Sequence, residues 1–121
     1  MKSIPSNQRD RIANLLFTTV YPLYVAKIQK KNRSEAELKQ VIQWFTGFTD
    51  VQLNQFINQN VTFLDFFDQA TIHQNAHLVT GSICGYKIEE IHDPLIKNVR
   101  ILDKLVDELA KGKSIEKILR K

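Results

Sequence analysis

"DPLIKNVRILDKLVDELAKGKSIEKILRK", the stretch from Asp93 to Lys121, decides the fold. Asp93 can cap a helix, and Pro94 suits the first helical position. Apolar residues then recur at helical spacing on one face: Leu95, Val99, Leu102, Val106 and Leu109. Gly112 can end the helix. We therefore predict one helix over residues 94–111, with Leu102 and Val106 buried.

The apolar stripe of this helix is wide, because Ile101 and Leu105 extend it beyond a coiled-coil seam. Charged residues occupy the opposite face: Arg100, Asp103, Lys104, Asp107, Glu108 and Lys111. A stripe of this width predicts packing into the chain's own core. The alternative is a homodimer through the C-terminal helices, extended by the short apolar segment after Ser114.

Helix start signals also recur earlier in the chain. Ser34 with Glu37 and Thr49 with Gln52 form capping boxes, and Thr62 resembles a third cap. A further helix is expected from Thr19, with Pro22 in its first turn. The 121 residues are 43% apolar and 25% charged, which are ordinary values for one globular domain. We predict an all-α protein: a tail over residues 1–10, then a compact single-domain bundle of five to seven helices over 11–121.

The segment 75–92 has two interpretations. As a helix, it would align Gly81, Cys84 and Ile88 on one stripe, where small residues let a second helix approach closely. As a small β-hairpin near 78–88, it would use Gly81-Ser82 as the turn and Tyr86-Lys87 in a strand. We favour the helix, because a lone hairpin is only marginally stable in water. In that case Cys84 is buried and chemically quiet.

The chain is expected to be cytoplasmic and not associated with a membrane. Its first residues lack the apolar run of a signal peptide, and no stretch approaches 18 consecutive apolar residues. One cysteine excludes an internal disulfide and fits a reducing compartment.

Uneven charge raises a nucleic-acid hypothesis. The net charge is +4, but residues 1–33 carry +6 and residues 34–93 carry −6. Helices over 35–46 and 50–58 have about the lengths of a helix-turn-helix. The residues that would bind nucleic acid are Lys27, Lys30, Lys31, Arg33, Gln52 and Gln55. Asp50 counts against this hypothesis, because it lies where phosphates would approach.

A metal hypothesis rests on His73 and His77, spaced i,i+4, with Cys84 or Asp68 as a third ligand. The spacing lacks the glutamate of the HExxH pattern, and there is no CxxC. Surface histidines are the favoured interpretation, and no cofactor is expected.

Three blocks of sequence together resemble one family. They are "VYPLYVAK" (Val20–Lys27), "VIQWFTGF" (Val41–Phe48) and "TGSICGYKIEEIHDPLIKNVRILDKLVDELAKGKSIEKILR" (Thr80–Arg120). They are similar to the uncharacterised bacterial family catalogued as domain of unknown function 2200, from about Arg11 to Arg120. The resemblance implies a small, single-domain bacterial protein, and it supplies no activity, cofactor or catalytic residue.

The sequence does not reveal a specific function. The leading hypothesis is a non-enzymatic cytosolic binding or interaction protein. The alternative is a nucleic-acid-binding protein that uses the basic N-terminal third and residues 35–58. An enzyme is third, because no set of residues meets the geometric demands of catalysis.

Overall fold

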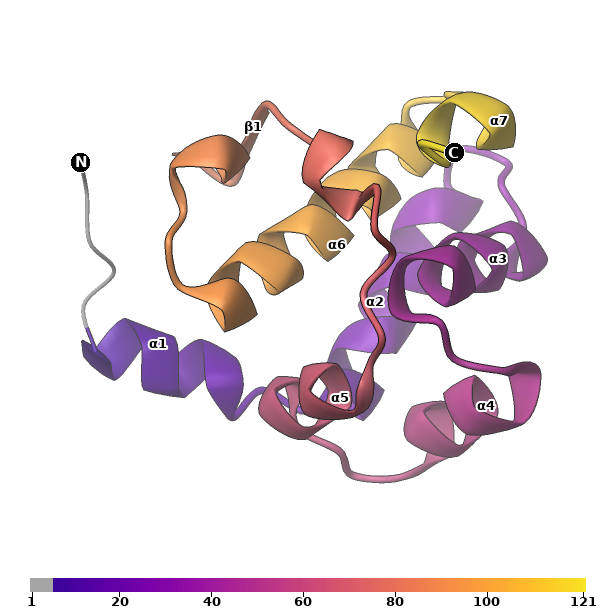
Figure 1. The fold of residues 1–121 in the computed structure, drawn as a ribbon. Helices are drawn as coiled ribbons and strands as arrows, with labels where there is room; N and C mark the ends of the chain where they lie inside the picture. Colours follow the sequence, from indigo (N-terminus) through magenta and orange to yellow (C-terminus); the bar gives the residue numbers. More distant parts are fainter. Residues whose placement is uncertain (1–5) are drawn as a thin grey trace.

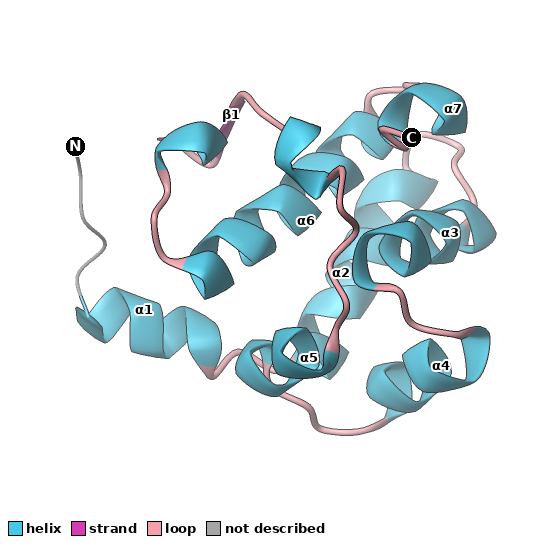
Figure 2. Ribbon diagram, in the orientation of Figure 1, coloured by secondary structure: helices cyan, strands magenta, loops and turns pink. Residues whose placement is uncertain are grey.

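Helix α6 (Pro94–Ala110) lies at the centre of the computed structural model, which describes residues 6–121 (Figure 1). The elements that contact α6 are α1 (Ser6–Ala13), α2 (Phe17–Gln29), α3 (Glu35–Thr46), α5 (Phe63–Gln69), α7 (Ile115–Ile118), the strand β1 (Ser82–Ile83) and the 3₁₀ turn η2 (Ile88–Glu90). Helix α4 (Asp50–Asn58) packs instead against α2 and α3. Within the described range the protein is a mostly helical single domain with seven α-helices and one small hairpin (Figure 2).

The predicted C-terminal helix is confirmed. The Asp93 carboxylate caps it by accepting hydrogen bonds from the backbone N–H groups of Leu95 (2.9 Å) and Ile96 (3.2 Å), and Pro94 takes the first helical position. The helix ends at Ala110, one residue before the predicted end. Leu102 and Val106 are buried, so the apolar stripe packs into the chain's own core as predicted.

The charged face of α6 is largely covered as well. The Tyr24 hydroxyl of α2 donates a hydrogen bond of 2.7 Å to Asp103. The Arg120 guanidinium, just beyond α7, donates to both carboxylate oxygens of Glu108 at 2.6 and 2.7 Å. Polar residues of α6 therefore join it to other elements, and the helix is enclosed on several sides.

Helix starts that were predicted from capping residues are also confirmed. Ser34 with Glu37 and Thr49 with Gln52 form complete capping boxes at α3 and α4. Thr62 caps α5 by accepting from the backbone N–H of Asp65 at 3.1 Å. These helices enclose an aromatic core whose fully buried members are Phe17, Phe45, Phe63 and Phe66.

Helix α2 begins earlier than predicted. It starts at Phe17, whose backbone N–H donates to the Val61 carbonyl at 2.8 Å, so Pro22 falls in the second turn rather than the first. The stripe that faces the core is consequently Phe17, Tyr21, Tyr24 and Ile28. A contact with the chain before α5, distant in sequence, therefore sets the start of α2.

The helical interpretation of residues 75–92 is wrong, and the hairpin near 78–88 is confirmed. Strand β1 pairs antiparallel with β2 (Tyr86–Lys87), and the turn is Cys84-Gly85 rather than Gly81-Ser82. Both turn residues have positive φ, +52° and +82°, and Gly81 has φ +99°, which an α-helix does not allow. Cys84 is exposed, and a side chain added at Gly85 would meet nothing within 4 Å, so neither packs against a helix.

Contacts with α6 explain why so short a hairpin holds. The Lys104 ammonium of α6 donates to the Ser82 carbonyl at 3.1 Å, and the Arg100 guanidinium lies 5.1 Å from the centre of the Tyr86 ring. Packing of this kind supplies the stability that an isolated hairpin lacks.

The predicted N-terminal tail, residues 1–10, lies partly outside the described residues. Helix α1 begins at Ser6, within that stretch, and contacts α5 and α6. Arg9 on α1 forms an ion pair with Asp93, the residue that caps α6.

None of the helices over residues 6–121 is long and apolar enough to cross a membrane.

Candidate functional site

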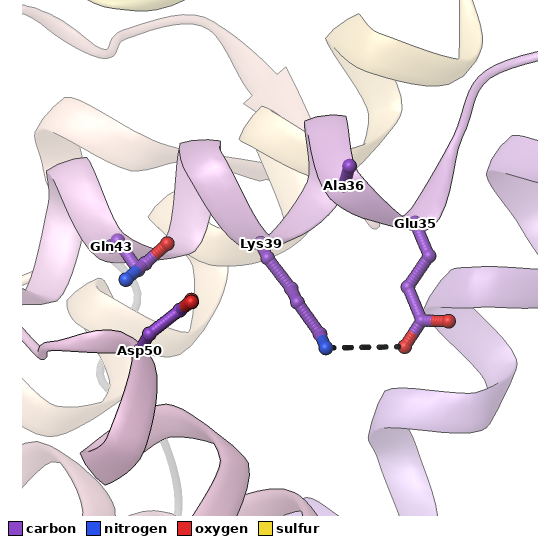
Figure 3. Close-up of a pocket in the computed structure, with 5 residues that line it drawn as sticks. All are labelled: Glu35, Ala36, Lys39, Gln43 and Asp50. Carbon is purple, nitrogen blue, oxygen red and sulfur yellow. Dashed lines mark ion pairs between the residues drawn. The ribbon is translucent and has the colours of Figure 1, made fainter.

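A polar groove lies where α3 meets the first turn of α4, beside α2 (Figure 3). It has a volume of about 330 Å³, and the residues that line it are Glu35, Ala36, Lys39, Gln43 and Asp50. In Figure 3 the side chains of Glu35 and Lys39 extend from α3 toward α2 and α4, while Asp50 projects from the start of α4. This groove is the candidate functional site.

Local sequence explains why these side chains face one direction. Glu35, Lys39 and Gln43 are spaced four residues apart, so they lie along one face of α3. The Ser34 cap fixes where α3 begins, and Gly47, at φ +74°, ends it in the left-handed conformation that favours glycine. The chain then reverses, and α4 begins with Asp50 beside the groove.

Hydrogen bonds and one ion pair connect three helices across this site. The Tyr21 hydroxyl of α2 donates to a Glu35 carboxylate oxygen at 2.7 Å. The Lys39 ammonium lies 4.0 Å from the same oxygen and donates to the Asn54 side chain of α4 at 3.1 Å. Burial, followed by the hydrogen bond to Glu35, raises the pKa of Tyr21 well above its usual value. Tyr21 is therefore a fixed donor rather than a base at neutral pH.

The groove carries net negative charge. Two carboxylates, those of Glu35 and Asp50, face one ammonium, that of Lys39. Lys39 already contacts Glu35 and Asn54. Asp50 has no ion-pair or hydrogen-bond partner for its carboxylate among residues 6–121. Chemically, the arrangement favours recognition of a polar or cationic group over nucleophilic attack, because no Ser, Thr, Cys or His within residues 6–121 lines the groove.

The basic residues predicted to bind nucleic acid are partly engaged within the protein. The Lys27 ammonium lies 3.4 Å from the Asp107 carboxylate of α6. Arg33 pairs with Glu37 at 2.9 Å and donates to the carbonyl oxygens of two residues near the end of α6, Leu109 (3.2 Å) and Lys113 (2.8 Å). Arg33 therefore holds the start of α3 against the C-terminus of α6.

The remaining predicted nucleic-acid residues lie on the surface of two helices. Lys30 and Lys31 are exposed at the C-terminal end of α2. Gln52 and Gln55 are exposed on α4, and the Gln52 side chain accepts a hydrogen bond from the Thr49 backbone at 2.9 Å. The two helices of the helix-turn-helix hypothesis thus form as predicted. One of the side chains expected to contact bases, that of Gln52, is instead part of the cap at the start of α4.

The residues of the metal hypothesis do not form a cluster. His73 stacks on Trp44 with ring centres 4.5 Å apart, and its Nδ1 accepts from the Asn75 backbone at 3.0 Å. His77 is exposed, with its Nδ1 2.8 Å from the Gln74 carbonyl. Cys84 lies at the exposed hairpin tip. The described part of the chain contains no group of three or more His, Cys, Asp or Glu side chains placed to hold a metal ion.

Comparison with known proteins identifies the family. The model described as "Uncharacterized protein conserved in bacteria (DUF2200)" matches residues 11–120. The chain belongs to the DUF2200 family. It is also similar to the solved structure titled "Crystal structure of uncharacterized protein SP1917", at 37% sequence identity and a TM-score of 0.86. That match covers 98% of this chain and 94% of the other. No curated protein matches the chain.

The family resemblance that the sequence indicated is therefore confirmed. The groove of this DUF2200 protein, by contrast, was not predicted from the sequence. The four-residue spacing of Glu35, Lys39 and Gln43 is visible in the sequence and marks the polar face of α3. The positions of Tyr21 and Asp50 depend on how α2 and α4 pack against that face. This part of the site required the structure.

Proposed function

We propose that this DUF2200 protein is a non-enzymatic cytosolic protein that binds a partner through the groove between α3 and α4. The observation that supports the proposal is the chain from Tyr21 through Glu35 and Lys39 to Asn54. It ties three helices together through two residues that line the groove, Glu35 and Lys39, and leaves Asp50 available to a partner. A site whose polar groups are already held in place binds a partner at a lower entropic cost.

The lining residues, together with Tyr21, which donates a hydrogen bond to Glu35, support binding rather than catalysis. Tyr21 is held protonated, and Lys39 contacts Glu35 and Asn54, so neither is poised as a base or a nucleophile. The carboxylates and the Gln43 amide can instead orient a partner through hydrogen bonds and charge.

The experiment compares two matched substitutions of exposed helical alanines. Ala36→Trp fills the groove, whereas Ala26→Trp places the same bulk on α2 at a position that does not line it. Partners captured from a bacterial lysate by the wild-type protein are purified, and their affinities for all three proteins are measured by calorimetry. We expect Ala36→Trp to weaken binding at least tenfold and Ala26→Trp to leave it unchanged.

Two results would contradict the proposal. Equal affinity of the wild-type and Ala36→Trp proteins for every purified partner would place binding elsewhere on the molecule. Conversion of a captured ligand to a product, detected by mass spectrometry during the binding experiment, would contradict a non-enzymatic role.

A further inference from the structure

The charges of the groove favour a positively charged partner over a negatively charged one. Lys39, the cation that lines the groove, contacts Glu35 at 4.0 Å and Asn54 at 3.1 Å. Asp50 is exposed at the start of α4, and the structure gives its carboxylate no partner within residues 6–121. An incoming cation would thus gain a carboxylate without displacing an existing ion pair.

The two helices that follow α3 in the chain, α4 and α5, have the same sign, whereas α2 ends in the exposed residues Lys30 and Lys31. The sequence contains no lysine or arginine between Lys39 and Lys87, so α4 and α5 carry no cation. Their charged residues are Asp50, Asp65 and Asp68, all exposed. A negative surface on one side of a groove raises the local concentration of positively charged partners there and the rate at which they associate.

The size of the groove and the residues near it limit which chemical group can occupy it. A volume of about 330 Å³ is near the lower end of the range of about 300–1,000 Å³ for ligand pockets, which suits a side chain better than a nucleotide. Ala36 contributes an apolar methyl group to the lining, and Val51, which follows Asp50 in the chain but does not line the groove, is 67% exposed. A long side chain with an apolar stem and a cationic head matches both features.

We propose that the groove receives an arginine side chain from a partner protein, with its guanidinium on the Asp50 carboxylate. This inference rests on the proposed function and specifies the partner's chemistry. A planar guanidinium pairs with a carboxylate through two parallel hydrogen bonds, and the Gln43 side-chain carbonyl can accept another. A lysine ammonium would make a less directional contact with the same groups.

The test uses three blocked pentapeptides, Gly-Gly-Xaa-Gly-Gly, in which the central residue is arginine, citrulline or glutamate. Citrulline has nearly the shape of arginine without its charge. Binding is followed by NMR as shifts in the backbone amide signals of the full chain. We expect the arginine peptide to shift amides around Lys39, Gln43 and Asp50 saturably, with an affinity at least about fivefold above that of citrulline.

Three variants sharpen the experiment. Asp50→Asn should abolish the preference for arginine over citrulline, because it removes the unpaired carboxylate and keeps the size of the side chain. Gln43→Glu should strengthen the preference by adding a second carboxylate. Asp68→Asn, an equal loss of charge on α5 outside the groove, should leave the preference at least half intact. Circular dichroism of each variant checks that the fold is retained.

The outcomes separate this inference from the proposed function. Equal affinities of the arginine and citrulline peptides for the groove would refute the preference for a positive charge. The proposal that the groove binds a partner would be unaffected. A preference for glutamate would show that the sign is wrong. No shift at the groove amides with any peptide would overturn the arginine inference, while the comparison of Ala36→Trp with Ala26→Trp still judges the proposed function.

Discussion

Removal of the Arg120 side chain should destabilise the protein strongly, although this residue is the second from the end of the printed sequence. In the structure Arg120 makes two hydrogen bonds, of 2.6 and 2.7 Å, to the carboxylate of Glu108 on α6. Glu108 is 8% exposed, and the Arg120 side chain is 16% exposed. Arg120→Ala would leave a nearly buried carboxylate without its main partner.

The expected cost follows from what remains around Glu108. Loss of one partner of a buried ion pair costs about 3–5 kcal/mol. The Lys113 ammonium lies 3.4 Å from the same carboxylate and would retain part of the compensation. We therefore expect the free energy of unfolding to fall by about 2–3 kcal/mol. For a domain of this size, that corresponds to a fall in Tm of about 8–12 °C.

Urea denaturation followed by circular dichroism measures this loss, with Lys121→Ala as the control. The control also removes one positive charge at the end of the chain, from an exposed residue, and should change stability by less than about 0.5 kcal/mol. If Arg120→Ala lowers the free energy of unfolding by less than about 1 kcal/mol, the pair contributes no more than an exposed ion pair does, and the reasoning is refuted.

The same pair predicts a dependence on pH. Burial alone would raise the pKa of Glu108, but the hydrogen bonds and charge of Arg120, with Lys113, outweigh it and lower that pKa. A lowered folded-state pKa contributes stability above the unfolded value of about 4.3, and this contribution is lost as pH falls through the folded pKa. The difference in stability between the wild-type protein and Arg120→Ala should thus be largest at neutral pH and shrink below about pH 4.

Three further predictions concern other parts of the molecule. Cys84→Asn should stabilise the hairpin by about 0.5–1 kcal/mol in urea denaturation, because asparagine tolerates positive φ better than cysteine does; a loss of stability would contradict the turn geometry. Fluorescence of Trp44 should change in His73→Gln and stay unchanged in His77→Gln, because the His73 ring stacks on Trp44 with ring centres 4.5 Å apart; a wild-type spectrum for His73→Gln would contradict this contact. Leu102→Ala should cost about 2–5 kcal/mol by opening a cavity beneath α6, and a cost below about 1 kcal/mol would show that Leu102 is not in a packed core.

Features that depend on neighbours in the chain were predictable from the sequence. The caps at Ser34 and Thr49 and the helix over 94–111 rest on contacts within three or four residues, and the structure confirms them. The wide apolar stripe of α6 likewise predicted burial correctly, because a helix of that composition must cover one face.

Features set by distant contacts were predicted poorly. Small residues at helical spacing made "GSICG" resemble a helix, but positive φ at Gly81, Cys84 and Gly85 follows from a turn that rests on α6. The start of α2 depends on a backbone contact with Val61. The groove depends on Tyr21 and Asn54 reaching α3 from other helices. The spacing of residues along α3 revealed only the polar face of that helix, which Tyr21 and Asn54 contact.

The central position of α6 has a consequence for biosynthesis. Helices α1, α2, α3 and α5 all contact a helix that is translated after them. At about 5–20 residues per second, the ribosome needs about 3–10 s to progress from the end of α4 to the end of α6. During that interval aromatic residues such as Phe17 and Phe45 have no completed core to enter. We therefore expect the nascent chain to complete its core only once α6 has been synthesised, rather than helix by helix, and to recruit chaperones that hold exposed apolar segments until then.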